Sequence, residues 1–148
     1  MATISGGDKL KSALDGIAKS VTKAATLQVG FLARATYPDG KSVAIIAAIQ
    51  EFGAASRGIP PRPFFRAMIS KHSSEWPGAI GNLLVANNYD ADKTLRQTGM
   101  AIKGQLAQSI IDTNSPPNAP STIRRKGGAS KVLVDTGHML NSIDFEVE

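Results

Sequence analysis

The side chains that could catalyse a reaction or bind a metal are few in this chain, and they form no known motif. Cysteine is absent, which excludes disulfides, thiolate metal ligands and thiol catalysis. The histidines, His72 and His138, lack the spacing that puts two ligands on one helical face. The twelve carboxylates are scattered or near the C-terminus, and no phosphate-binding loop or nucleophile elbow occurs. We therefore expect no enzyme activity, no metal and no cofactor.

Charge is segregated along the chain. Between residues 54 and 72 and between residues 115 and 134 every charged side chain is basic, whereas the last fourteen residues hold acids and no lysine or arginine. The net charge of +5 favours polyanions without identifying one. The residues concerned include Arg124, Arg125 and Lys126 in the second basic segment and Asp144, Glu146 and Glu148 in the acidic end. The basic triplet could follow phosphates, bind an acidic protein surface or stay solvated.

Segment 60–66 combines prolines, arginines and two adjacent phenylalanines. Arginine and aromatic side chains are enriched in buried protein contacts, and proline lowers the entropy that a segment loses when it docks. We predict a subunit contact here. There are two alternatives: the arginines are solvated and the phenylalanines belong to the core, or the segment stacks on single-stranded nucleic acid. The candidate contact residues are Pro60, Arg62, Pro63, Phe64 and Phe65. Nearby, Glu51 is expected to hydrogen-bond local backbone or to pair with an arginine.

Apolar periodicity predicts a chain with several helices and a little sheet. Spacings of three and four residues predict helices over 8–23, from 63 to 84 with a break near 73–74, and from 90 to 113. Alternation predicts strands over 26–34 and 140–147. Residues 42–52 could be a buried strand, but their alanine content and Ser42 as a cap favour a helix that ends at Gly53. In the long helix, Gly99 and Gly104 predict close approach by another backbone.

These elements predict an α+β fold in which a small, mostly antiparallel sheet packs against several helices. The length fits one domain over residues 1–148. Prolines and glycines predict irregular chain over 54–63 and a long loop over 114–131 near the C-terminus, which we expect to be mobile until the protein assembles. No signal peptide or apolar span is evident, so we expect a protein made in a cytoplasm and independent of membranes.

Three stretches of the chain, taken in order, resemble the bacteriophage tail-completion and neck family, also called head-tail joining or virion morphogenesis proteins. They are QVGF (28–31), VAIIAAIQEFGAASRGIPPRPFF (43–65) and PSTIRRKGGASKVLVDTGHMLNSIDFEV (120–147). That family has A-x-x-x-E-F-G leading into I-P-x-R-P-F, then an S-T-x-x-x-K loop, an L-x-D-T-G turn and S-I. The matching positions include Ala47, Glu51, Phe52, Gly53, Ile59, Pro60, Arg62, Pro63, Phe64, Ser121, Thr122, Lys126, Leu133, Asp135, Thr136, Gly137, Ser142 and Ile143. Val132 departs from the pattern, where proline is expected.

The resemblance implies a small α+β subunit without catalytic activity that forms a homo-oligomeric ring, commonly six-fold or a multiple of six, between the DNA-filled head and the tail. It implies a virion location, assembly in the host cytoplasm, contacts with other neck, connector and tail proteins, and a passing contact with genomic DNA. Which ring is formed stays open: a tail terminator, a completion protein on the head connector, or a collar. A small basic nucleic-acid-binding protein is the alternative.

Segregated charge adds one expectation about such a ring. The basic residues Arg124, Arg125 and Lys126 of one copy are expected to pair with the acidic end of an adjacent copy. Exposed pairs contribute about 0.2 to 1 kcal/mol each, so they would set orientation rather than affinity.

Overall fold

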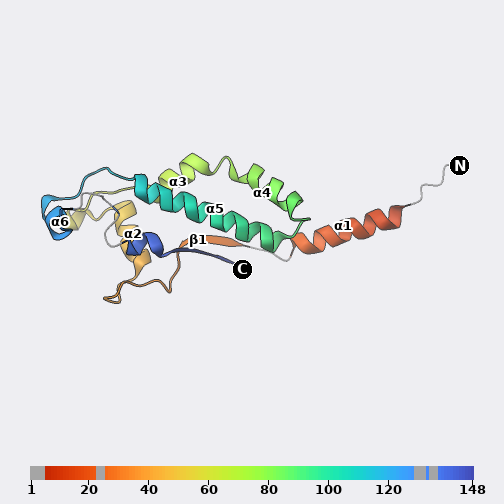
Figure 1. The fold of residues 1–148 in the computed structure, drawn as a ribbon, viewed down its shortest axis with the longest axis horizontal. Coiled ribbons are helices and arrows are strands. Elements are labelled where there is room, and N and C mark those ends of the chain that lie inside the picture. Colours follow the sequence, from red (N-terminus) through yellow and green to blue (C-terminus); the bar gives the residue numbers. More distant parts are fainter. Residues whose placement is uncertain (1–5, 23–25, 129–132, 134–136) are drawn as a thin grey trace.

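The computed structural model describes residues 6–22, 26–128, 133 and 137–148, and it places one long helix at the centre of an elongated α+β fold (Figure 1). This confirms the predicted fold class. The described elements are α1 (Gly7–Val21), β1 (Leu27–Phe31), α2 (Val43–Phe52), the 3-10 helix η1 (Ala55–Arg57), α3 (Phe64–His72), α4 (Trp76–Ala86), α5 (Ala91–Asp112), α6 (Pro120–Arg125), α7 (His138–Asn141) and β2 (Ile143–Val147).

The sheet consists of β1 and β2, which pair antiparallel although they come from opposite ends of the chain. Leu27 lies opposite Val147, and Phe31 lies opposite Ile143. Side chains alternate along a strand, so the apolar residues of both strands share one face, which packs on α5. The other face carries the polar side chains Gln28, Asp144, Glu146 and Glu148.

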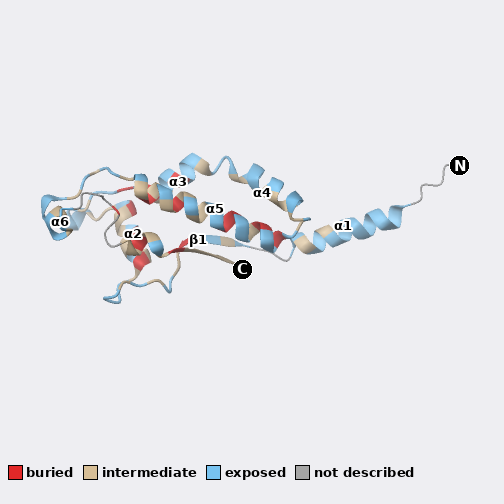
Figure 2. Ribbon diagram, in the orientation of Figure 1, coloured by how far each residue is buried: buried red, intermediate tan, exposed pale blue. Residues whose placement is uncertain are grey.

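Helix α5 lies between the sheet and α4 (Figure 1), whereas the start of α3 reaches β1 through Phe64. Of the predicted apolar stripe of α5, Ala91, Leu106 and Ile110 are buried, and Leu95 and Ile102 are half-buried. The core gathers residues of α2, α3, α5, α7 and the start of β2, together with Leu133 (Figure 2). Its buried residues are Val43, Ala47, Phe64, Met68, Leu106, Ile110, Leu133, Met139 and Ile143.

Sequence periodicity missed two buried polar residues of α5, Thr94 and Thr98. Each hydroxyl donates a hydrogen bond to the carbonyl four residues earlier, Thr94 to Asp90 at 2.7 Å and Thr98 to Thr94 at 2.9 Å. A threonine whose hydroxyl is satisfied within its own helix can be buried at little cost.

The N-terminal half of the prediction is largely confirmed. Helix α2 forms as expected, because the Ser42 hydroxyl accepts a hydrogen bond from the Ile45 N–H at 3.4 Å and Gly53 ends the helix at a φ of 77°. The break before α4 also occurs, and Pro77 lies in the first turn of α4, where its missing N–H costs nothing. Asp8 does not cap α1, since the cap is Gly6 and Asp8 lies in the first turn. The segment expected to be wholly irregular after Gly53 contains η1.

The C-terminal elements differ from the prediction. The expected loop over 114–131 contains α6, because Pro120 at the first helical position pre-sets the backbone, and Gly127 and Gly128 end the helix with positive φ. The expected strand over 140–147 is divided into α7 and β2. Positive φ at Gly137 permits the turn that starts α7.

The two glycines of α5 have different surroundings. A Cβ on Gly99 would meet the Phe145 ring at 2.5 Å and the Leu27 side chain at 2.9 Å, whereas a Cβ on Gly104 would meet nothing within 4 Å. The predicted close approach is therefore wrong at Gly104, whereas at Gly99 the sheet does approach closely and its nearest atoms are side chains of Phe145 and Leu27.

This difference yields a matched pair of variants. Gly99→Ala should lower the free energy of unfolding by about 1 to 3 kcal/mol, because the added methyl group overpacks the contact between helix and sheet. Gly104→Ala should raise it by up to about 1 kcal/mol, because alanine is the better helix former. Urea unfolding followed by circular dichroism measures both. Equal stabilisation of the two variants would contradict the packing described for Gly99.

Candidate functional site

The buried carboxylate of Glu51 joins α2 to the start of α3. Glu51 is 4% exposed and accepts hydrogen bonds from the backbone N–H of Phe65 at 2.8 Å and of Arg66 at 3.2 Å. It also accepts from Arg66 Nε at 2.7 Å. The first N–H groups of a helix need acceptors, and Pro63 before α3 supplies no side-chain cap. Glu51 fills this role from a neighbouring helix. The expected arginine partner is confirmed, whereas the backbone groups that Glu51 accepts from lie on α3 and are not local to α2.

Arg62 joins the same region to the segment before α6. Its side chain is buried, with Nε donating to the Pro116 carbonyl at 2.9 Å and Nη2 to the Pro117 carbonyl at 3.2 Å. Nη1 donates to Gln50 Oε1 at 2.9 Å, and the Arg62 N–H donates to the Gln50 carbonyl at 2.7 Å. Burial lowers the pKa of Arg62, because the charged guanidinium loses contact with water. Residues 116–118 thus have hydrogen-bond partners in the fold, and the mobility expected of the whole loop before assembly stays a prediction.

The structure corrects part of the predicted subunit contact. Arg62 and Phe64 point into the fold, and Phe64 is 1% exposed with its ring edge-on to Phe31 at a centroid distance of 6.3 Å. Neither side chain is available to another copy in this conformation, because each fills its own subunit. Phe65 is half-buried, and Pro60 and Pro63 are exposed, so these three keep a surface position.

An apolar groove lies beside these motif residues. It encloses about 270 Å³ between β1, α2 and α3 and is called the α2–α3 groove below. Phe52 at its rim is 67% exposed, and the Arg66 guanidinium lies 5.1 Å from the centre of the Phe52 ring. Three alanines of α2 and four phenylalanines form most of the groove wall. The lining residues are Phe31, Ala44, Ala47, Ala48, Glu51, Phe52, Phe64, Phe65 and Arg66.

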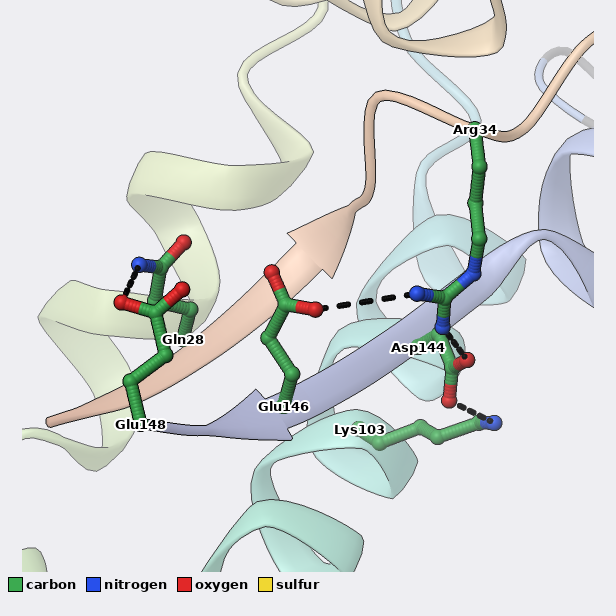
Figure 3. A network of polar contacts seen from close by, with 6 residues as sticks. All are labelled: Gln28, Arg34, Lys103, Asp144, Glu146 and Glu148. Carbon is green, nitrogen blue, oxygen red and sulfur yellow. Dashed lines mark hydrogen bonds and ion pairs between the residues drawn. The ribbon is translucent and has the colours of Figure 1, made fainter.

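The acidic C-terminal strand has partners within its own chain (Figure 3). Asp144 accepts from Arg34 at 2.9 Å and from Lys103 at 3.3 Å, and Glu146 lies 3.6 Å from Arg34. Gln28 donates to Glu148 at 3.3 Å. The backbone N–H of Phe145, followed by Arg34 and Lys103, lowers the pKa of Asp144.

These contacts weaken the case for pairing between copies. Any pairing of Asp144 or Glu146 with the basic triplet of another copy must compete with Arg34 and Lys103. Sequence reasoning missed both bases, because nothing local signals that Arg34 lies beside Asp144, 110 residues away.

The predicted basic segment lies at the end of the molecule opposite α1 (Figure 1). Arg124 and Arg125 are exposed on α6, and Lys126 is half-buried at its end. Arg125 and Lys126 line a cavity of about 520 Å³ between α6, the turn near Lys41 and α7. In the predicted D-T-G turn, Asp135 and Thr136 lie outside the described residues.

The described residues contain no group of three or more histidines and carboxylates placed to hold a metal ion. None of the described helices is both long enough and apolar enough to span a bilayer. Comparisons with protein-family models, with curated proteins and with solved structures found no significant match.

Removing the carboxylate that caps α3 should destabilise the fold. We expect Glu51→Ala to lower the free energy of unfolding by about 1 to 3 kcal/mol, because the N–H groups of Phe65 and Arg66 lose their acceptor. Asp92→Ala is the control, since it removes an exposed first-turn carboxylate paired with Arg96 at 2.8 Å. That change should cost less than about 1 kcal/mol. Equal losses in chemical unfolding would argue against the cap.

Removing the Arg62 side chain should loosen α6 selectively. In Arg62→Ala the carbonyls of Pro116 and Pro117 lose their donor, so amide hydrogen exchange should quicken over residues 120–128 while α5 keeps its protection. The control is Arg57→Ala, which removes an exposed arginine of η1. Unchanged exchange over 120–128 in Arg62→Ala would mean that other contacts hold this segment.

Proposed function

We propose that this protein is a structural subunit of a phage neck or tail-terminus ring, which completes the tail and joins it to the DNA-filled head. The proposal starts from the resemblance of residues 28–31, 43–65 and 120–147 to that family. The observation that carries it further is the exposed α2–α3 groove, which lies beside the motif residues Glu51, Phe52 and Phe64. We propose a homo-oligomeric ring, six-fold or a multiple, with connector and tail proteins as neighbours.

The roles of the motif residues favour a structural function. Glu51 caps a helix, Arg62 holds residues 116–118 and Phe64 fills the core. Glu51 lines the α2–α3 groove, but its carboxylate oxygens already accept hydrogen bonds from the start of α3 and from Arg66. These three roles fix the walls of an apolar surface before any partner arrives, and preorganised surfaces lose less entropy on binding. Exposed apolar patches of this kind are typical of protein contact sites.

The alternative, a small basic nucleic-acid-binding protein, is favoured by a different observation. Arg124 and Arg125 are exposed at one end of the molecule beside the flexible-backbone residues Gly127 and Gly128. Binding through such residues depends on phosphate contacts, which release counterions and weaken steeply as salt rises. Assembly through the apolar groove should depend far less on salt.

A pair of surface variants tests the proposed function. Phe52→Asp places a charge at the groove rim and should stop the joining of heads to tails, because the contact would have to bury a carboxylate. Val85→Asp makes the same type of change at an exposed position of α4 and should leave infectivity unchanged. Plaque titre and electron microscopy of lysates measure the effect, and circular dichroism checks that both variants fold.

Two results would contradict this proposal. One is a normal titre for Phe52→Asp. The other is a map of the intact virion that places the protein as a single copy away from the tail axis. Steeply salt-dependent DNA binding that Arg124→Glu with Arg125→Glu abolishes, together with a normal Phe52→Asp titre, would favour the nucleic-acid alternative.

A further inference from the structure

Helix α1 is amphipathic, yet its apolar stripe is uncovered. Leu10, Leu14, Ile17 and Val21 follow one another at spacings of four, three and four residues, which places them on one face. Leu10 is 63% exposed and Leu14 is 55% exposed, and no residue of α1 is buried (Figure 2). An apolar stripe of this regularity is normally covered by another element, so a surface that receives it should exist.

The outward face of α2 has the features of such a surface. Ala44, Ala48 and Phe52 form a row at four-residue spacing beside exposed Ile45, and the row lines the α2–α3 groove. Small side chains along a row let a second helix approach closely, with large side chains packing on either side. The lengths also agree, since the stripe from Leu10 to Val21 spans about 16 Å and α2 spans about 15 Å at 1.5 Å per residue.

The fold disfavours contact between α1 and the groove of its own chain. Helix α1 extends away from the sheet at the start of β1, whereas α2 lies near the other end of β1 (Figure 1). In this conformation α1 does not reach the groove of its own chain. The outer face of the sheet carries Asp144, Glu146 and Glu148 (Figure 3), so it is a poor cover for an apolar stripe. Helix α1 of another copy can occupy the groove without any change in this conformation.

We propose that α1 of one copy docks, through its apolar stripe, in the α2–α3 groove of the next copy. Each subunit then provides one helix and receives one, which is a heterologous contact that closes into a ring when the rotation between subunits permits. The inference rests on the proposed self-assembly, and it identifies the two surfaces that form the contact between subunits.

Cysteine cross-linking tests this contact directly, because the chain has no cysteine of its own. A mixture of the single variants Leu14→Cys and Ala48→Cys should give a covalent dimer on oxidation, and the double variant should give a ladder of covalent multimers. The matched control replaces Leu14→Cys with Ser12→Cys, on the opposite face of α1, and should give little cross-linking. The reactions are run on the free protein at high concentration and on assembled particles.

Each other outcome overturns the inference. A bond only within single chains would mean that α1 folds back on its own groove, and bonds only between two Leu14→Cys chains would mean that α1 pairs with α1. No bond in either sample would place the groove against another partner. If rings are nevertheless seen in virions, this contact fails while the ring proposal stands; if particles contain no ring of this protein, the proposed function fails as well.

A second measurement does not depend on oxidation. Leu14→Lys should weaken self-association by about tenfold or more, because a charged side chain replaces one that the contact buries. Ser12→Lys should leave self-association unchanged. Both positions are exposed in the subunit, so both variants should fold. Sedimentation equilibrium compares them, and equal association would overturn the docking of the stripe.

Discussion

One buried carboxylate determines the geometry on which the motif region depends. Helix α3 starts directly after a proline-rich segment that offers no side-chain cap, so its first N–H groups need an acceptor from elsewhere. Glu51 supplies it from α2, and the positive end of the α3 dipole favours its negative charge. Because the acceptor is on α2, the hydrogen bonds that satisfy the first N–H groups of α3 also set how the two helices pack against each other. The groove between them follows from that arrangement.

The same region ties distant parts of the chain together. Arg62 links Gln50, at the end of α2, to Pro116 and Pro117, which precede α6. Ser109 of α5 donates to the Phe64 carbonyl at 2.7 Å, which fixes the start of α3 from the opposite side. Segments that are far apart in sequence, residues 50–64 and 109–117, therefore meet through hydrogen bonds. Arg62 and Ser109 hold backbone carbonyls in place, and a contact surface that forms before its partner binds requires such fixed positions.

Periodicity predicted α2, α3 and α5 well, because each buries one side of a helix against the same core. Periodicity does not predict burial or pairing that depends on residues far away in the sequence. Arg62 and Phe64 look alike in sequence as contact residues, yet long-range hydrogen bonds and the Phe31 ring draw both inward. The pairing of Arg34 with Asp144 depends on β1 meeting β2 and has no local signal. The pattern does not predict helix α6, because prolines and glycines over 114–131 indicate a loop although proline is favoured at a helix start.

The apolar stripe of α1 shows why a pattern can predict an element correctly and still misjudge its surroundings. Amphipathic spacing predicts that one face of a helix is buried, but it does not predict whether that face packs against the same chain or another one. The outer face of the sheet is one surface that could cover it, but it carries Asp144 and Glu146, which form ion pairs with Arg34 and Lys103. Covering them with leucine and isoleucine would remove water from charged groups without replacing its hydrogen bonds. The polar face of the sheet is therefore an unfavourable cover for the stripe, whereas the proposed groove of another copy is apolar.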